Sequence, residues 1–157
     1  QPQRSNVANG QPLLSAPYGI YATANGYIAL AMMDIHLLAK AIGCTDLNRF
    51  SKAQVFSERD AIKTILANYL VTQKTDMWLE LLQNEGLWAM EVLDWEGMTK
   101  SEAYKCLQME QSVKTATGDI ITTRCPIRIN GKKIVSSQPA PQLGEHNQKI
   151  YQDLINS

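Results

Sequence analysis

The spacing of apolar residues predicts a hairpin followed by a helix near the start of the chain. Strand-forming residues run from 18 to 32 and are interrupted by Asn25-Gly26, a pair typical of the type I′ turn in tight hairpins. Asp34 precedes apolar residues at helical spacing, and Gly43 follows the last of them. We therefore expect a helix that the side chain of Asp34 caps and that Gly43 ends in a left-handed conformation.

Two more amphipathic helices are expected between residues 57 and 86. Ser57 and Asp60 have the spacing of a capping box. The apolar positions that follow recur every three or four residues and are Ile62, Ile65, Leu66, Tyr69 and Leu70. Thr75 should cap the next helix, which Gly86 ends. Residues 87–93 are apolar enough for a buried strand, although periodicity alone also allows a helical turn.

The second half of the chain has a different texture. Thr99 and Glu102 have capping-box spacing and predict a short helix. Its inward residues should be Ala103, Cys106 and Leu107. Residues 113–135 are rich in Thr, Ile and Val and contain turn signals at 117–119 and 130–131, which predict three short strands. A final helix should carry Ile150, Leu154 and Ile155. This order of elements favours an α+β fold with antiparallel strands.

Composition narrows the class of protein and its partners. Fifteen basic residues balance fifteen acidic ones among 157, so no charged field favours a nucleic acid or an anionic membrane. The longest apolar stretch is far shorter than the roughly 18 residues of a membrane span, and no signal-peptide pattern occurs at the amino terminus. Three widely spaced cysteines without a C-x-x-C motif are typical of a reducing compartment. We expect a soluble, cytoplasmic protein.

The residues alone do not point to a catalytic or metal site. No glycine-rich phosphate loop occurs, which argues against nucleotide hydrolysis. The two histidines, His36 and His146, lack partners at metal-ligand spacing and are expected to serve in helix packing and helix entry. Asp34, Asp60 and Asp76 stand at predicted helix starts, where a carboxylate satisfies backbone amides. We therefore expect no metal site and no catalytic residue in this chain.

The cysteines and tryptophans are interpreted as packing residues. Cys44, Cys106 and Cys125 lack basic neighbours that would lower their pKa, so we expect small buried hydrophobes. The three tryptophans follow core spacing or flank a strand, which favours core or interface packing over a ligand cage. They are Trp78, Trp88 and Trp95.

Several short motifs occur in order along nearly the whole chain. They begin with residues 16–21 (APYGIY) and 23–30 (TANGYIAL), continue through 75–86 and 125–131 (CPIRING), and end with 140–147 (APQLGEHN). In this order they resemble family III CoA-transferases, the group of formyl-CoA transferase, carnitine CoA-transferase and alpha-methylacyl-CoA racemase. Asn25 stands where the family usually has Asp, and Asn suits a turn equally well.

The resemblance implies a domain organisation. Residues 1–12 would be a linker, 13–92 the small domain with antiparallel strands and flanking helices, and 93–157 a strand-rich segment with a carboxyl-terminal helix. In the full-length family that last segment returns to complete the large α/β domain. Without that domain, we expect residues 113–135 to leave an apolar face partly uncovered.

The resemblance also implies a function. Such enzymes move CoA from an acyl-CoA thioester to a carboxylic acid through an aspartyl-acyl anhydride, using no metal. Their nucleophilic aspartate lies upstream of the region matched here, so this chain would be inactive alone. Its partner would be the missing amino-terminal half, or a second copy as in the family's interlocked homodimer. A free-standing module that binds a ligand or partner without catalysis is the alternative.

One loop is a candidate for substrate binding by the same resemblance. In formyl-CoA transferase a glycine-rich loop before the first strand of the small domain covers the active site. Asn9, Gly10 and Gln11 stand at the corresponding place, with one glycine instead of a run. We expect these three residues to act as a lid.

Overall fold

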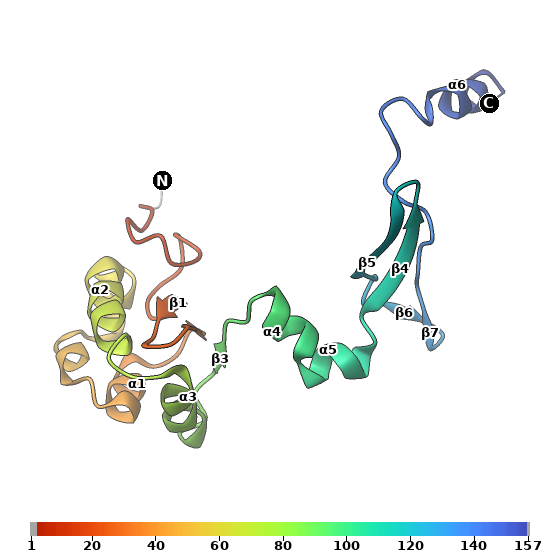
Figure 1. Cartoon of the computed structure of the whole chain (residues 1–157). Coiled ribbons are helices and arrows are strands. Elements are labelled where there is room, and N and C mark those ends of the chain that lie inside the picture. Colours follow the sequence, from red (N-terminus) through yellow and green to blue (C-terminus); the bar gives the residue numbers. More distant parts are fainter. Residues whose placement is uncertain (1–2, 157) are drawn as a thin grey trace. The chain divides into compact units, whose positions relative to one another are not determined.

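The computed structural model describes residues 3–156 and divides into two compact units, residues 1–94 and residues 95–157 (Figure 1). The division falls between a unit with a large hydrophobic core and a unit with few buried side chains. Among the described residues, no helix combines the length and the apolar character needed to cross a membrane.

The first unit is built on a three-stranded antiparallel sheet. Its strands are β1 (Gly19–Ala22), β2 (Tyr27–Leu30) and β3 (Ala89–Glu91), with β2 in the centre. Side chains alternate across the pleat, so Tyr21, Ile28 and Leu30 are buried on one face. Ile20 and Tyr27 are exposed on the other. The predicted hairpin is confirmed, and residues 87–93 do contain a strand, because β3 pairs with β2.

Helices cover the buried face of this sheet (Figure 1). In chain order they are α1 (Ile35–Ile42), the 3₁₀ turns η1 (Thr45–Arg49) and η2 (Lys52–Val55), α2 (Arg59–Leu70) and α3 (Thr75–Asn84). Their fully buried apolar side chains are Leu38, Leu47, Ile62, Leu66, Leu70 and Leu82. Trp78 is 3% exposed and donates its indole N–H to the carbonyl of Leu70 at 2.7 Å, which confirms it as a core residue.

Helix α1 forms as its sequence predicts. The Asp34 carboxylate accepts the backbone N–H groups of His36 at 2.9 Å and Leu37 at 3.2 Å. Gly43 ends the helix at φ 74°, a conformation that glycine adopts without steric cost. Asp34 and Gly43 were sufficient to predict the two ends of the helix, because the groups that each residue bonds lie within the helix or next to it.

The prediction of a type I′ turn at Asn25-Gly26 is wrong. Ala22 pairs with Tyr27, so four residues connect β1 and β2, and neither Asn25 nor Gly26 has positive φ. The Asn25 carboxamide instead accepts the backbone N–H of Thr75 at 2.8 Å and its hydroxyl at 3.2 Å. Thr75 is therefore the first residue of α3 and not its cap, because the capping oxygen comes from the hairpin turn.

The capping box predicted at Ser57 and Asp60 is also wrong. Helix α2 begins at Arg59, and the Ser57 hydroxyl donates to the carbonyl of Gln54 at 3.4 Å. Asp60 accepts the hydroxyl of Ser5 at 2.5 Å and the backbone N–H of Asn6 at 3.0 Å. A contact with the amino-terminal segment thus takes the place of the local cap.

The second unit consists of short helices and two separate hairpins. Helices α4 (Trp95–Lys100) and α5 (Glu102–Leu107) precede the hairpin of β4 (Glu110–Thr115) and β5 (Gly118–Thr123). A second hairpin pairs β6 (Arg128–Ile129) with β7 (Lys132–Lys133), and α6 (Asn147–Ile155) follows. The prediction of three strands is therefore replaced by four strands in two two-stranded sheets.

Details of the short helix differ from the sequence prediction. Ser101 caps α5 by accepting the backbone N–H of Tyr104 at 3.2 Å, so the Thr99–Glu102 capping box is wrong. Tyr104 is the inward residue, whereas Cys106 and Leu107 are exposed. A unit this small has few side chains with which to cover a helix, so most positions of α5 face solvent.

Several other packing predictions need correction. Cys44 is buried as expected, but Cys106 and Cys125 are exposed. Trp88 is 80% and Trp95 is 75% exposed, so neither is a core residue, while packing at an interface stays a prediction for both. The uncovered apolar surface predicted for residues 113–135 is confirmed. Its most exposed apolar members are Ile120, Ile121, Ile127, Ile129 and Val135.

Candidate functional site

The loop formed by Asn9, Gly10 and Gln11 lies along the edge of β1. The backbone carbonyl of Asn9 accepts the N–H of Ile20 at 2.6 Å, so the loop extends the hydrogen bonding of the sheet by one bond. The N–H of Ser5 donates to the carbonyl of Pro12 at 2.8 Å and closes the base of the loop. The Gln11 side chain accepts the N–H of Leu13 at 3.0 Å. These bonds hold the loop in one defined position against the first unit.

Two glycines allow this close approach. A Cβ atom on Gly19 would lie 2.7 Å from Nδ2 of Asn9, closer than real side chains come. Gly10 has φ 144°, and a Cβ there would lie 3.4 Å from the Cα of Gly19 and 3.5 Å from the ring of Tyr18. Sequence reasoning did not identify Tyr18 and Gly19 as the residues against which the loop packs. That contact depends on two backbone segments that lie close together only in the folded chain.

Within this loop, the side-chain amide atoms of Asn9 are buried. Its amide nitrogen and oxygen have no hydrogen-bond partner among the residues that the structure describes. The nearby Tyr21 hydroxyl donates to the carbonyl of Pro17 at 2.7 Å, and burial raises the pKa of that phenol. The Asn9 side chain lies close enough to this hydroxyl to oppose the rise, so the two side chains are neighbours within the first unit.

An apolar pocket opens beside the same loop. Its volume is 520 Å³, and it is lined by residues of β2 and β3, by residues next to the strands and by one residue of α3. The lining includes Tyr18, Leu30, Leu87, Trp88 and Met90. Since Gly10 contacts the ring of Tyr18, the loop and the pocket share a wall. A pocket of this size and apolar character suits the hydrocarbon part of a small ligand.

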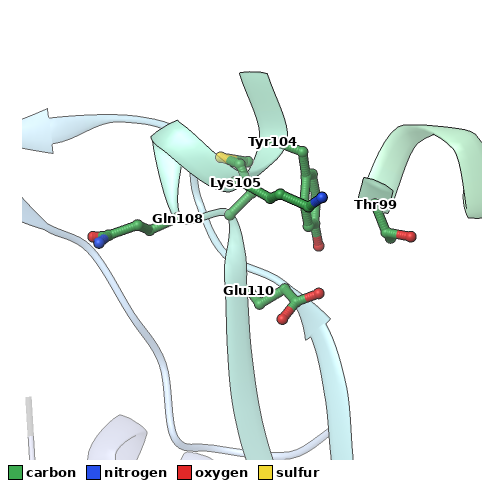
Figure 2. A pocket seen from close by; sticks show the side chains of 6 residues that line it. Thr99, Tyr104, Lys105, Gln108 and Glu110 are labelled. Carbon is green, nitrogen blue, oxygen red and sulfur yellow. The ribbon is translucent and has the colours of Figure 1, made fainter. Parts of the chain in front are cut away.

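A second pocket lies in the other unit and is polar (Figure 2). Its volume is 380 Å³. Figure 2 shows Lys105 beside the ring of Tyr104, with Glu110 below them, Thr99 across the pocket and Gln108 pointing away. An ammonium, a carboxylate and two hydroxyl groups can hold a polar ligand by hydrogen bonds.

A buried arginine fixes the shape of this polar pocket. Arg124 is 3% exposed, and its guanidinium donates to the carbonyls of Gln108 at 2.7 Å, Leu107 at 2.6 Å and Cys125. Gln108 ends α5 at φ 50°. Arg124 therefore satisfies carbonyls that the end of the helix leaves free and joins α5 to β5. Residue spacing did not predict that Arg124 would bond the carbonyls at the end of α5.

The described residues do not form a recognisable catalytic group. No group of three or more potential metal ligands occurs among residues 3–156. His36 is half-buried in α1, and His146 is exposed at the start of α6 without a capping hydrogen bond from its side chain. Asp34 is engaged with Lys52 and with the helix amides, which lower its pKa to about 2. These groups support the structure and are not arranged around a reacting atom.

Comparison with known proteins identifies the family. The sequence model of CoA-transferase family III matches residues 1–147. The chain belongs to CoA-transferase family III. Among curated proteins, the chain is similar to the Probable fatty acyl-CoA transferase Rv3272 of Mycobacterium tuberculosis, to which it is 28% identical over 145 residues. That alignment covers 88% of this chain and 37% of the relative.

Solved structures agree with this assignment. The crystal structure of an aspartate-to-alanine mutant of Rv3272 has a TM-score of 0.60 and 25% identity, and the match covers 86% of this chain and 39% of that one. A CAIB/BAIF family protein from Brucella suis has a TM-score of 0.62 and 23% identity, with coverage of 93% and 39%. The α+β fold is therefore that of the family, and the chain spans well under half the length of these relatives.

Proposed function

We propose that this chain is the carboxyl-terminal portion of a family III CoA-transferase. The complete protein would move CoA from an acyl-CoA thioester to a carboxylic acid. An aspartate outside this chain would attack the thioester, form an aspartyl-acyl anhydride and release the CoA thiolate. The acceptor carboxylate would then displace the donor carboxylate from the anhydride, and the CoA thiolate would attack the acceptor's acyl carbon, which forms the new thioester and releases the aspartate. The single observation that carries this proposal is the family match over residues 1–147.

The partial length supports assigning a supporting role to this chain. The alignment covers 37% of the curated relative, so most of a complete family member lies outside the matched region. We infer that the nucleophile belongs to the remaining part of the protein. The partner would be that part, or a second copy of the chain that exchanges segments with it. The cysteine pattern supports a reducing compartment, and the proposed location is the cytoplasm.

Within this assembly the first unit would shape the substrate site. The loop Asn9–Gln11 would act as a lid, since it lies along the edge of β1 and next to Tyr18, which lines the apolar pocket. The apolar pocket that shares Tyr18 with the loop would receive the hydrocarbon part of the acyl group. Large-domain residues would then supply the CoA contacts.

The second candidate function is a free-standing module that binds a ligand without catalysis. The apolar pocket favours it, because that pocket is formed by residues of the first unit alone. The two candidate functions differ in whether the pocket takes part in CoA transfer once the remaining part of a family member is present.

A complementation assay separates the two candidates. The chain is mixed or co-expressed with the amino-terminal part of a family member, and transfer of CoA from an acyl-CoA to a carboxylic acid is followed by mass spectrometry. The proposal predicts turnover by the mixture and none by the chain alone. In the working mixture, Trp88→Ala should raise the KM for the acyl-CoA, whereas Trp95→Ala, in the other unit, serves as the matched control. Ligand binding without turnover in any mixture would favour the non-catalytic module.

A further inference from the structure

Two buried cations lie one helical turn apart on α2. Arg59 is 4% exposed and Lys63 is fully buried, and their spacing of four residues places both on the same helix face. Arg59 Nε and Lys63 Nζ have no hydrogen-bond partner among the residues that the structure describes. Buried charged groups are normally paired, so two unpaired cations on one face indicate a missing negative partner.

The neighbouring groups supply only part of that partner, because Asp60 attracts both cations but its oxygens bond to Ser5 and Asn6. The Arg59 guanidinium donates its Nη atoms to the backbone carbonyls of Phe56, at 2.7 Å, and Gln3. Those hydrogen bonds satisfy the Nη donors, but the neutral carbonyls do not balance the positive charge of the guanidinium. The carboxylate of Asp60 is taken by Ser5 at 2.5 Å and Asn6 at 3.0 Å.

The charge and the number of free donors define the ligand. Two cations, Arg59 and Lys63, and one carboxylate, Asp60, leave one positive charge, while Arg4 and Glu58 are exposed to solvent. A carboxylate carries one negative charge and two oxygens, one for each unpaired nitrogen. A phosphate dianion would carry more charge and more oxygens than these donors can satisfy in a buried position.

We propose that Arg59 Nε and Lys63 Nζ form a binding site for a monocarboxylate. One carboxylate oxygen would accept from Nε and the other from Nζ. The segment 3–6, which three hydrogen bonds to Arg59 and Asp60 hold on α2, would lift to admit the ligand. Burial lowers the pKa of the Lys63 amine, and a bound carboxylate would raise that pKa again.

The test is thermal unfolding of the full chain at neutral pH, with acetate replacing chloride at constant ionic strength. A ligand that binds only the folded state raises the Tm with its concentration. Acetate should raise the Tm of the wild type, and Lys63→Met should weaken the apparent affinity at least about tenfold. Lys40→Met, an exposed change of the same kind on α1, should respond like the wild type.

Further arms make the outcome decisive. Without carboxylate, Lys63→Met should be at least as stable as the wild type, because it removes an unpaired buried charge. Nuclear Overhauser contacts between acetate and the Lys63 side chain in the wild type provide a readout that needs no variant. N-acetyl-aspartyl amide, used in parallel, distinguishes a free acid from a protein carboxylate, according to which ligand binds more tightly. Equal responses to phosphate and acetate, an unchanged response in Lys63→Met, or no acetate contacts would overturn the proposal.

Discussion

At the scale of single residues, the most informative contact joins Asn25 to the start of α3. Its carboxamide oxygen accepts two hydrogen bonds from Thr75, fifty residues away. Replacing a capping side chain with Ala costs typically about 1 kcal/mol, so Asn25→Ala should lower the free energy of unfolding by that amount. Urea unfolding followed by the fluorescence of Trp78 measures it. Asn48→Ala, at an exposed position in η1, is the control and should change stability little. Equal effects of the two changes would contradict the capping role.

Asp34 provides a prediction about acid. A hydrogen bond from Lys52 and the amides of His36 and Leu37 lower the pKa of its carboxyl from 3.8 to about 2. A carboxylate with a lowered pKa stabilises the fold above 3.8, and this contribution is lost as the pH falls toward 2. Asp34→Asn retains a capping oxygen and removes the charge. The wild type should therefore lose stability relative to Asp34→Asn across this interval in acid unfolding curves, and high salt should reduce the difference. Parallel acid unfolding curves for the wild type and Asp34→Asn would show that the charge of Asp34 contributes nothing to stability.

The residues that sequence reasoning placed correctly are those with partners close in the chain. Asp34 and Gly43 act on their own helix, so local spacing predicted both. Asn25 and Asp60 were misassigned because each bonds to a segment about fifty residues away. Spacing rules contain no information about such partners, and a tertiary hydrogen bond then replaces the local cap.

At the scale of elements, two of the three Asn-Gly pairs in the chain connect neighbouring strands, and these two form different turns. Asn130 and Gly131 have φ of 50° and 76° and connect β6 to β7 as a two-residue type I′ turn. At 25–26 the turn is longer, because Asn25 is oriented toward α3. The same dipeptide is decisive only where no other element competes for its side chain.

This difference predicts opposite tolerance at two glycines. Gly131→Ala forces a side chain into a left-handed conformation, which costs roughly 1–2 kcal/mol. Gly26 has no positive φ, and a Cβ there would lie 3.4 Å from the Thr75 hydroxyl, an ordinary contact. Hydrogen exchange of the backbone amides should therefore speed up across β6 and β7 in Gly131→Ala. Gly26→Ala should leave the exchange rates of β1 and β2 nearly unchanged. Faster exchange at the first turn only would contradict this view of the two turns.

At the scale of the whole molecule, the second unit exposes apolar side chains that need a partner. Ile121 is 72% and Ile129 is 61% exposed. Large exposed apolar patches usually mark interaction sites, and we expect these side chains to belong to one. The chain alone should therefore bind a hydrophobic dye and associate at high concentration, as measured by light scattering. The double variant Ile121→Thr and Ile129→Thr keeps the branched side chains that strands favour and should reduce both signals without loss of circular dichroism. A monodisperse monomer that binds no dye would contradict the prediction.

The candidate site could be predicted only in part from the sequence. The resemblance to the family pointed to Asn9, Gly10 and Gln11, whose role as a lid remains a proposal. Tyr18 and Gly19, against which the loop lies, had been counted only as part of a motif. Arg124 was not identified at all, since its three carbonyl partners come together only after α5 and β5 have formed.

We expect the attacking carboxylate of the complete enzyme to lie outside the residues of this chain. The most direct measurement traps the covalent intermediate in the complemented protein with hydroxylamine, which converts an aspartyl anhydride to a hydroxamate, and locates the label by peptide mass spectrometry. We predict the label on an aspartate of the complementing part and none on this chain. A hydroxamate on an Asp or Glu of this chain would contradict the account.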